Sequence, residues 1–168
     1  MTIINTPNLR DLLQTSRALA EKTALKELSH GSALHDAIRY HYQTPGSEAR
    51  AALCLSASLA LGLTAKSAAR LAASVETLHN ASLIQDDLQD RDAFRRGKTA
   101  IWKEFGPDIA INATDLLIAS AFELVASASP DSAHRLVSTM NRAIARTLQG
   151  QTKDLDAGRD LNVDQAIT

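Results

Sequence analysis

Cysteine, proline, glycine and aromatic side chains are scarce in this 168-residue chain, which holds 1 Cys, 4 Pro and 7 Gly and is 4% aromatic. The single cysteine, Cys54, excludes an internal disulfide framework and a cysteine-based zinc site. The low glycine and proline content excludes a collagen-like or low-complexity chain. An excess of one charge is also missing, because 18 basic and 19 acidic residues leave a net charge of −1. Without a basic field, we expect no binding to nucleic acid.

Targeting and membrane signals are missing as well. The first twenty residues have no basic start followed by an apolar block, so no signal peptide is predicted. The longest nearly apolar run, 51–63, is shorter than the roughly 20 residues that cross a bilayer. These absences predict no transmembrane segment and a cytoplasmic location.

Alanine and leucine, by contrast, recur at helical spacing along almost the whole chain. Strand-like alternation is absent, so we predict an all-α helical bundle, formed as a single domain by residues 1–168. The expected helices cover 7–30, 32–42, 49–61, 65–89, 99–105, 108–127, 130–154 and a last one from 162, with a loop at 91–97 and a break at 157–160. No stop signal follows the last helix, and we therefore expect the sequence to be the front part of a longer, truncated chain.

Three carboxylates stand near the end of the helix expected over 65–89. Asp86 and Asp90 are four residues apart and share a helix face, with Asp87 beside them. Like charges at this spacing repel by about 0.2–0.5 kcal/mol, and each opposes the helix dipole by about 0.3–1 kcal/mol. A solvated helix end is one interpretation. The other is a site for Mg²⁺ or Mn²⁺, completed by substrate phosphates because Mg²⁺ rarely has an all-protein cage.

Two arginines follow this cluster at short range. Arg95 and Arg96 precede Gly97, which permits close backbone approach to a ligand. Arginine suits bidentate contacts with phosphate. Carboxylates for a metal, followed by arginines for an anion, predict a diphosphate site.

The segment 86–97 resembles the first aspartate-rich motif, DDxxDxxxxRRG, of the trans-isoprenyl diphosphate synthases (polyprenyl synthetases). Residues 150–155 are similar to the GQxxDL helix of this family. The resemblance implies the isoprenoid synthase fold without its C-terminal helices and second aspartate-rich motif. It also implies a homodimer, with the helix over 109–125 at the interface.

The activity implied is a prenyl transfer in isoprenoid biosynthesis, in which an allylic prenyl diphosphate is ionised and then elongated with isopentenyl diphosphate. By resemblance, the metal ligands are Asp86, Asp87 and Asp90, and Arg95 contacts the allylic diphosphate. The resemblance further assigns isopentenyl diphosphate binding to His79 and Arg96, and the opposite wall of the site to Gln151 and Asp154. The small residues Ala81 and Ser82 leave the pocket floor open, which implies a product of C20 or longer. Glu76 either orients His79 or faces solvent.

The family's isopentenyl diphosphate motif, GGKRxRP, departs here. Arg50 is present, but Ser47 and Glu48 replace the lysine and the first arginine. Two lost charge-assisted contacts, at about 1.5–3 kcal/mol each, weaken the binding of isopentenyl diphosphate. The alternatives are therefore a class I terpene cyclase, a prenyltransferase to another acceptor, or a non-catalytic partner subunit. The 168 residues alone are expected to be inactive.

Overall fold

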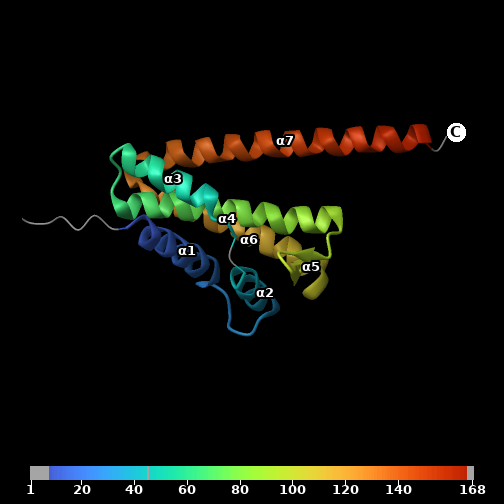
Figure 1. The fold of residues 1–168 in the computed structure, drawn as a ribbon, viewed down its shortest axis with the longest axis horizontal. Helices are drawn as coiled ribbons and strands as arrows, with labels where there is room; N and C mark the ends of the chain where they lie inside the picture. The colour runs from blue at the N-terminus through green and yellow to red at the C-terminus, as the bar shows by residue number, and fades with distance from the viewer. Residues whose placement is uncertain (1–7, 45, 166–168) are drawn as a thin grey trace, which may run out of the picture.

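The computed structural model describes residues 8–44 and 46–165, and this part of the chain is almost entirely helical (Figure 1). The elements, in order, are α1 (Leu9–Leu25), α2 (Ala33–Tyr42), α3 (Ala49–Ala60), α4 (Ala65–Asp90), β1 (Phe94–Arg95), β2 (Lys98–Thr99), α5 (Ile101–Glu104), α6 (Pro107–Ala128), the 3₁₀ turn η1 (Pro130–Ser132) and α7 (Ala133–Gln165). The predicted all-α bundle is confirmed.

Local capping explains where several helices begin. The side chains of Asn8, Ser32 and Thr64 accept hydrogen bonds from backbone N–H groups in the first turns of α1, α2 and α4. Pro107 stands in the first turn of α6, where a missing N–H costs nothing.

The core forms where α4 lies beside α6, in the middle of the bundle (Figure 1). Small side chains dominate it, and the buried alanines of α4 and α6 permit close helix packing. Ile84 and Leu117 are the large residues buried at this contact. A second cluster, centred on Leu55, packs α1 and α3 against the first half of α4. The buried alanine and leucine side chains thus hold α4 in the centre of the bundle.

Three local predictions were wrong. The segment 91–97, predicted to be a loop, contains β1 and the turn of a small antiparallel hairpin. Arg96 and Gly97 form this turn with φ of 53° and 79°, and two successive positive φ values favour a two-residue hairpin turn. The first helix ends at Leu25 rather than residue 30, since the chain turns there and packs Leu28 on the core. The break at 157–160 is absent, because α7 continues to Gln165 and tolerates Gly158 at about 1 kcal/mol.

One described helix, α6, is long and apolar enough to cross a membrane by length and composition alone. In its most apolar window 44% of the residues are buried inside the bundle, as in the core helix of a globular protein. The expectation of no transmembrane segment stays a prediction.

Candidate functional site

An apolar cavity of about 770 Å³ opens between α4, α6 and α7. Its walls are mostly aliphatic, and the exposed side chains Val75, Ile111 and Leu148 contribute to them. Polar groups stand at its edges, among them Arg50, His79, Asp115 and Gln151. A pocket of this kind, apolar with a few polar groups, suits a long hydrocarbon ligand with a polar end.

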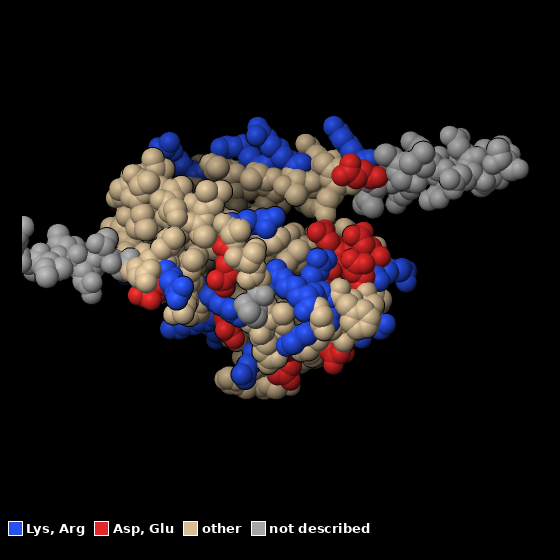
Figure 2. Space-filling model, in the orientation of Figure 1, with Lys and Arg blue, Asp and Glu red and all other residues tan. Residues whose placement is uncertain are grey.

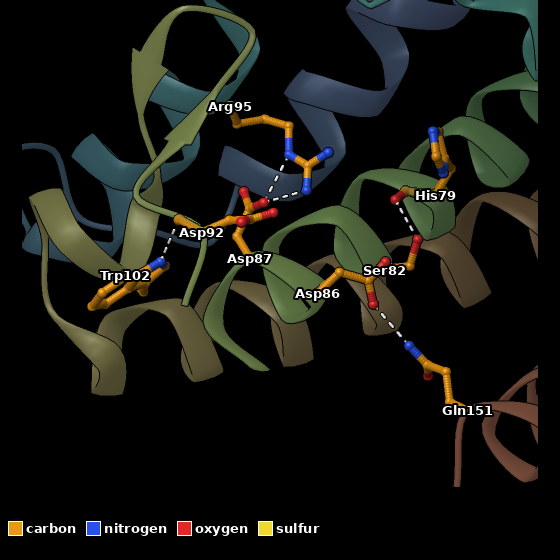
Figure 3. Close-up of polar contacts among 8 residues, drawn as sticks. All are labelled: His79, Ser82, Asp86, Asp87, Asp92, Arg95, Trp102 and Gln151. Carbon is orange, nitrogen blue, oxygen red and sulfur yellow. Dashed lines mark hydrogen bonds and ion pairs between the residues drawn. The ribbon is translucent and has the colours of Figure 1, made fainter. Parts of the chain in front are cut away.

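Asp86 faces α7 across the cavity (Figure 3). Gln151 Nε2 donates a hydrogen bond of 2.7 Å to Asp86 Oδ1, joining α4 to α7. Asp154, one turn further along α7, is exposed and does not line the cavity. Of the two residues expected on the opposite wall, the structure brings only Gln151 to the carboxylates.

Asp87 points the other way, toward the hairpin (Figure 3). It is buried, and Arg95 Nε donates to its Oδ1 over 2.7 Å while Arg95 Nη2 contacts the same oxygen. Burial raises the pKa of the Asp87 carboxyl, although the Arg95 contact acts in the opposite direction. Asp90 is exposed at the end of α4. Figure 2 shows acidic side chains gathered at this end of the bundle, beside basic ones.

The donor set fits Mg²⁺ by ligand type. Asp86 and Asp90 offer carboxylate oxygens from one helix face, and Mg²⁺ combines a few carboxylates with waters and phosphates. Within residues 8–44 and 46–154, no three His, Cys, Asp or Glu side chains converge on a ready-made ion site. Both Arg95 contacts of Asp87 use its Oδ1. The residues therefore suit a metal site that is completed by a phosphorylated ligand.

His79 and Arg50 meet at the mouth of the cavity, where Arg50 Nη1 lies 3.1 Å from His79 Nε2. Arginine can only donate, so His79 Nε2 accepts and is unprotonated in this arrangement. Burial lowers the pKa of His79, and the charges of Arg50 and Arg96 lower it further. Arg50 is exposed and projects its charge where an anion can approach.

Arg96 is held by residues that the sequence analysis did not assign to the site. Its guanidinium donates to the Thr44 carbonyl oxygen and lies against Gly46, where an added Cβ would be 2.5 Å from Nη2. His41 also lies here, and burial lowers its pKa to about 4. The one available signal was glycine in the turn before α3, because only glycine leaves room for this arginine.

The two residues predicted to form the pocket floor, Ala81 and Ser82, lie in different environments. Ala81 is 1% exposed, and Ser82 lines the same cavity with its Oγ donating to the His79 carbonyl oxygen over 2.8 Å. Neither side chain blocks the cavity. Ser47 is exposed, whereas Glu48 is partly buried beside Arg17.

The family follows from this geometry and from comparison with known proteins. Residues 32–167 match the family model described as polyprenyl synthetase. This chain belongs to the polyprenyl synthetase family. A chloroplast protein of Arabidopsis thaliana, the heterodimeric geranylgeranyl pyrophosphate synthase large subunit 1, is 39% identical over 140 residues, which cover 77% of this chain and 38% of that protein.

A second relative and a solved structure are also similar to this chain. A dimethylallyltranstransferase of Fischerella ambigua is 32% identical over 169 residues, covering 95% of this chain and 49% of its own. The solved structure of geranylgeranyl pyrophosphate synthetase from the archaeon Geoglobus acetivorans superposes with a TM-score of 0.79 at 29% identity, covering 88% of this chain and 48% of that one. The isoprenoid synthase fold is thus confirmed over about half of such proteins.

This polyprenyl synthetase chain spans about half or less of the length of the relatives it matches. Its single-domain organisation, cytoplasmic location and homodimer stay predictions. The roles assigned to its site residues also stay predictions.

Proposed function

We propose that this chain provides the allylic-substrate side of a Mg²⁺-dependent prenyltransferase of isoprenoid biosynthesis. The observation that carries the proposal is the hydrogen bond between Asp86 and Gln151, because Gln151 lines an apolar cavity of about 770 Å³. A prenyl diphosphate matches both parts, because its tail is apolar and its head is a polyanion. The tail lies in the cavity, and the diphosphate lies at the end of α4.

The side chains at the diphosphate end of the substrate have different roles. Asp86, Asp87 and Asp90 would hold Mg²⁺, which would supply positive charge to stabilise the negative charge on the leaving diphosphate. Arg95 leaves Asp87 and contacts that diphosphate. The bond between C1 and the diphosphate oxygen breaks, its electron pair leaves with the diphosphate, and an allylic cation forms. The aliphatic walls keep water from this cation.

Chain elongation is the first candidate for the next step. A double bond of isopentenyl diphosphate supplies the electron pair for the new C–C bond, and a proton is then lost. The similarity to geranylgeranyl pyrophosphate synthases of Arabidopsis thaliana and Geoglobus acetivorans supports this candidate. With Ala81 and Ser82 at an open floor, the product is C20 or longer.

A second candidate keeps the ionisation step and changes the acceptor. Here the allylic cation is attacked by a double bond of its own chain, as in a class I terpene cyclase, or by an acceptor without a diphosphate. Glu48 favours this candidate, because it places a carboxylate where the family motif has a cation.

Calorimetry with farnesyl diphosphate tests the ionisation side. We expect Mg²⁺-dependent binding to the 168-residue chain, weakened about 100-fold in Asp86→Asn/Asp90→Asn, because charge-assisted contacts contribute about 1.5–3 kcal/mol each. Asp131→Asn, an exposed acid on η1, is the matched control and leaves affinity unchanged. Binding that is independent of Mg²⁺, or equal in the double variant, contradicts the proposal.

Products formed by the full-length protein then separate the candidates, because the 168 residues alone are expected to be inactive. Elongation only when isopentenyl diphosphate is added supports the first. Release of a hydrocarbon or alcohol without it supports the second. Binding without turnover supports a non-catalytic partner subunit.

A further inference from the structure

The two faces of α7 differ in chemistry. Its inner face contributes aliphatic side chains, among them Ile144, to the cavity of about 770 Å³. Its outer face carries a line of cations, which we call the basic row and which consists of Arg135, Arg142, Arg146 and Lys153. Successive members are seven, four and seven residues apart, so they share one side of the helix over about five turns, or about 27 Å. Ile144 stands midway between Arg142 and Arg146 and therefore projects from nearly the opposite side.

The basic row lies on the outside of the molecule. α7 runs along one edge of the bundle and packs on α6 (Figure 1). All four members of the row are exposed, and Figure 2 shows basic side chains along this edge. The Arg142 guanidinium is held along the helix, because it donates to Ser138 Oγ and Thr139 Oγ1, each over 3.1 Å. The row is therefore accessible to an approaching surface.

Acids do not balance the basic row within 133–154, the part of α7 whose side chains are described. The one acid there, Asp154, is offset by about 100° around the helix from Lys153. None of the ion pairs between described residues includes a member of the row. On α1, by contrast, Asp11 and Glu21 are interspersed with basic residues, as on an ordinary solvated helix. The row is therefore a local excess of positive charge in a chain whose net charge is −1.

A membrane surface matches both the row and what lies behind it. Anionic lipid headgroups form a plane of negative charge, which a straight row of cations can contact along its whole length. The helix is about 10 Å thick, so docking of its outer face places the apolar cavity close to the membrane, where hydrocarbon tails dissolve. An acidic protein or a nucleic acid matches the charge of the row but has no relation to the apolar cavity.

We propose that the basic row docks α7 on an anionic membrane surface, with the helix parallel to the headgroups and the cavity on the side away from them. The contact is electrostatic and requires no helix to cross the bilayer. Each basic side chain near such a surface raises the partition coefficient about fivefold. Docking requires neither Mg²⁺ nor a substrate, so it is independent of the proposed prenyl transfer.

Cosedimentation of the 168-residue chain with lipid vesicles tests the proposal. We expect binding to vesicles of phosphatidylcholine and phosphatidylglycerol in equal amounts, and little binding to phosphatidylcholine alone. Added salt weakens this binding, because it screens exposed charges. Arg142→Gln/Arg146→Gln is expected to weaken it about 25-fold, at about fivefold for each lost cation.

Two control variants separate the row from net charge and from folding. Arg10→Gln/Arg39→Gln removes the same charge from exposed positions on α1 and α2, which lie across α4 from α7 (Figure 1), and leaves binding nearly unchanged. Arg142→Lys/Arg146→Lys keeps the charge and is expected to bind vesicles like wild type. Helical circular dichroism that matches wild type shows that each variant is folded.

Three outcomes would overturn the proposal. Equal binding to both kinds of vesicle, or to neither, removes the role of anionic lipid. Equal losses in the α7 pair and in the α1 and α2 pair assign the effect to net charge. Binding to polyglutamate as tight as binding to the anionic vesicles indicates an acidic polypeptide as the partner. Calorimetry with farnesyl diphosphate on the same α7 variants is expected to match wild type, so the failure of membrane docking is distinguishable from the failure of the proposed function.

Discussion

The end of α4 and the pocket at the start of α3 handle charge in opposite ways. At the end of α4 the acids outnumber their protein partners, since Arg95 pairs with Asp87 while Asp90 is exposed. At the start of α3, two acids face two arginines, namely Glu48, Glu76, Arg17 and Arg96. Exposed, unbalanced acids remain hydrated and available to a cation, whereas buried charge requires a partner. The acids at the end of α4 are therefore available to bind a ligand, whereas the charges at the start of α3 already balance one another.

The largest expected effect comes from breaking one ion pair in each region. Arg95→Ala leaves buried Asp87 without its partner and is expected to cost about 3–5 kcal/mol of unfolding free energy. Arg17→Ala breaks a partly exposed pair with Glu48 and one backbone contact, with the Tyr42 carbonyl oxygen, at about 1–2 kcal/mol. Urea unfolding measures both values. Equal losses would show that the two regions do not differ as described.

Added Mg²⁺ sharpens this comparison. A cation can replace Arg95 as the partner of Asp87, so Mg²⁺ is expected to restore more stability to Arg95→Ala than to wild type. Arg17→Ala is the control and shows no extra recovery. Recovery of the same size in both variants would argue against Asp87 as a metal ligand.

His41 lies between the two regions and gives the next largest effect. Its pKa is about 4 in the folded chain against 6.5 unfolded, so below pH 6.5 the unfolded chain binds the proton first. Stability due to neutral His41 is therefore complete above pH 6.5 and is lost as pH falls toward 4, by on the order of 3 kcal/mol. Melting temperatures of wild type and His41→Gln between pH 7 and 4.5 measure it. Parallel curves for the two proteins would contradict the prediction.

The smallest effect concerns the cavity beside the α4 site. Ser82→Phe places a ring on the cavity wall and is expected to weaken geranylgeranyl diphosphate binding about tenfold, or about 1.4 kcal/mol, with little change for geranyl diphosphate. Ser82→Ala is the matched control and leaves both affinities unchanged. If Ser82→Phe weakens both ligands equally, Ser82 does not limit tail length.

The helices were predictable because their signals are local. Ser32 and Thr64 stand directly before the helices they cap, and alanine and leucine repeat at helical spacing along α4 and α6. The hairpin was missed because its turn depends on positive φ at Arg96, a residue type that seldom adopts it. The predicted break in α7 was wrong, because the free-energy cost of one glycine is too small to end a long helix.

The site residues also differ in whether local sequence or tertiary packing reveals them. Residues of one motif, such as Asp86 and Asp90, were found by spacing on one helix. Gln151 was placed opposite them by resemblance, and the structure joins it to Asp86. His41 and Thr44 were not assigned to the site, and Glu76 was left between two alternatives, because the surroundings of all three depend on packing among four helices.

The sequence by itself determined the helical class, the position of the acids near the end of α4 and the loss of cations at Ser47 and Glu48, since these depend on residue type and spacing. Only the tertiary structure decided that Asp87 turns to Arg95 and that Glu48 pairs with Arg17. The physical reason is that the direction of a charged side chain depends on burial and on partners supplied by distant segments. A charge pattern therefore predicts which ligands are possible, and packing determines which charges remain available to bind them.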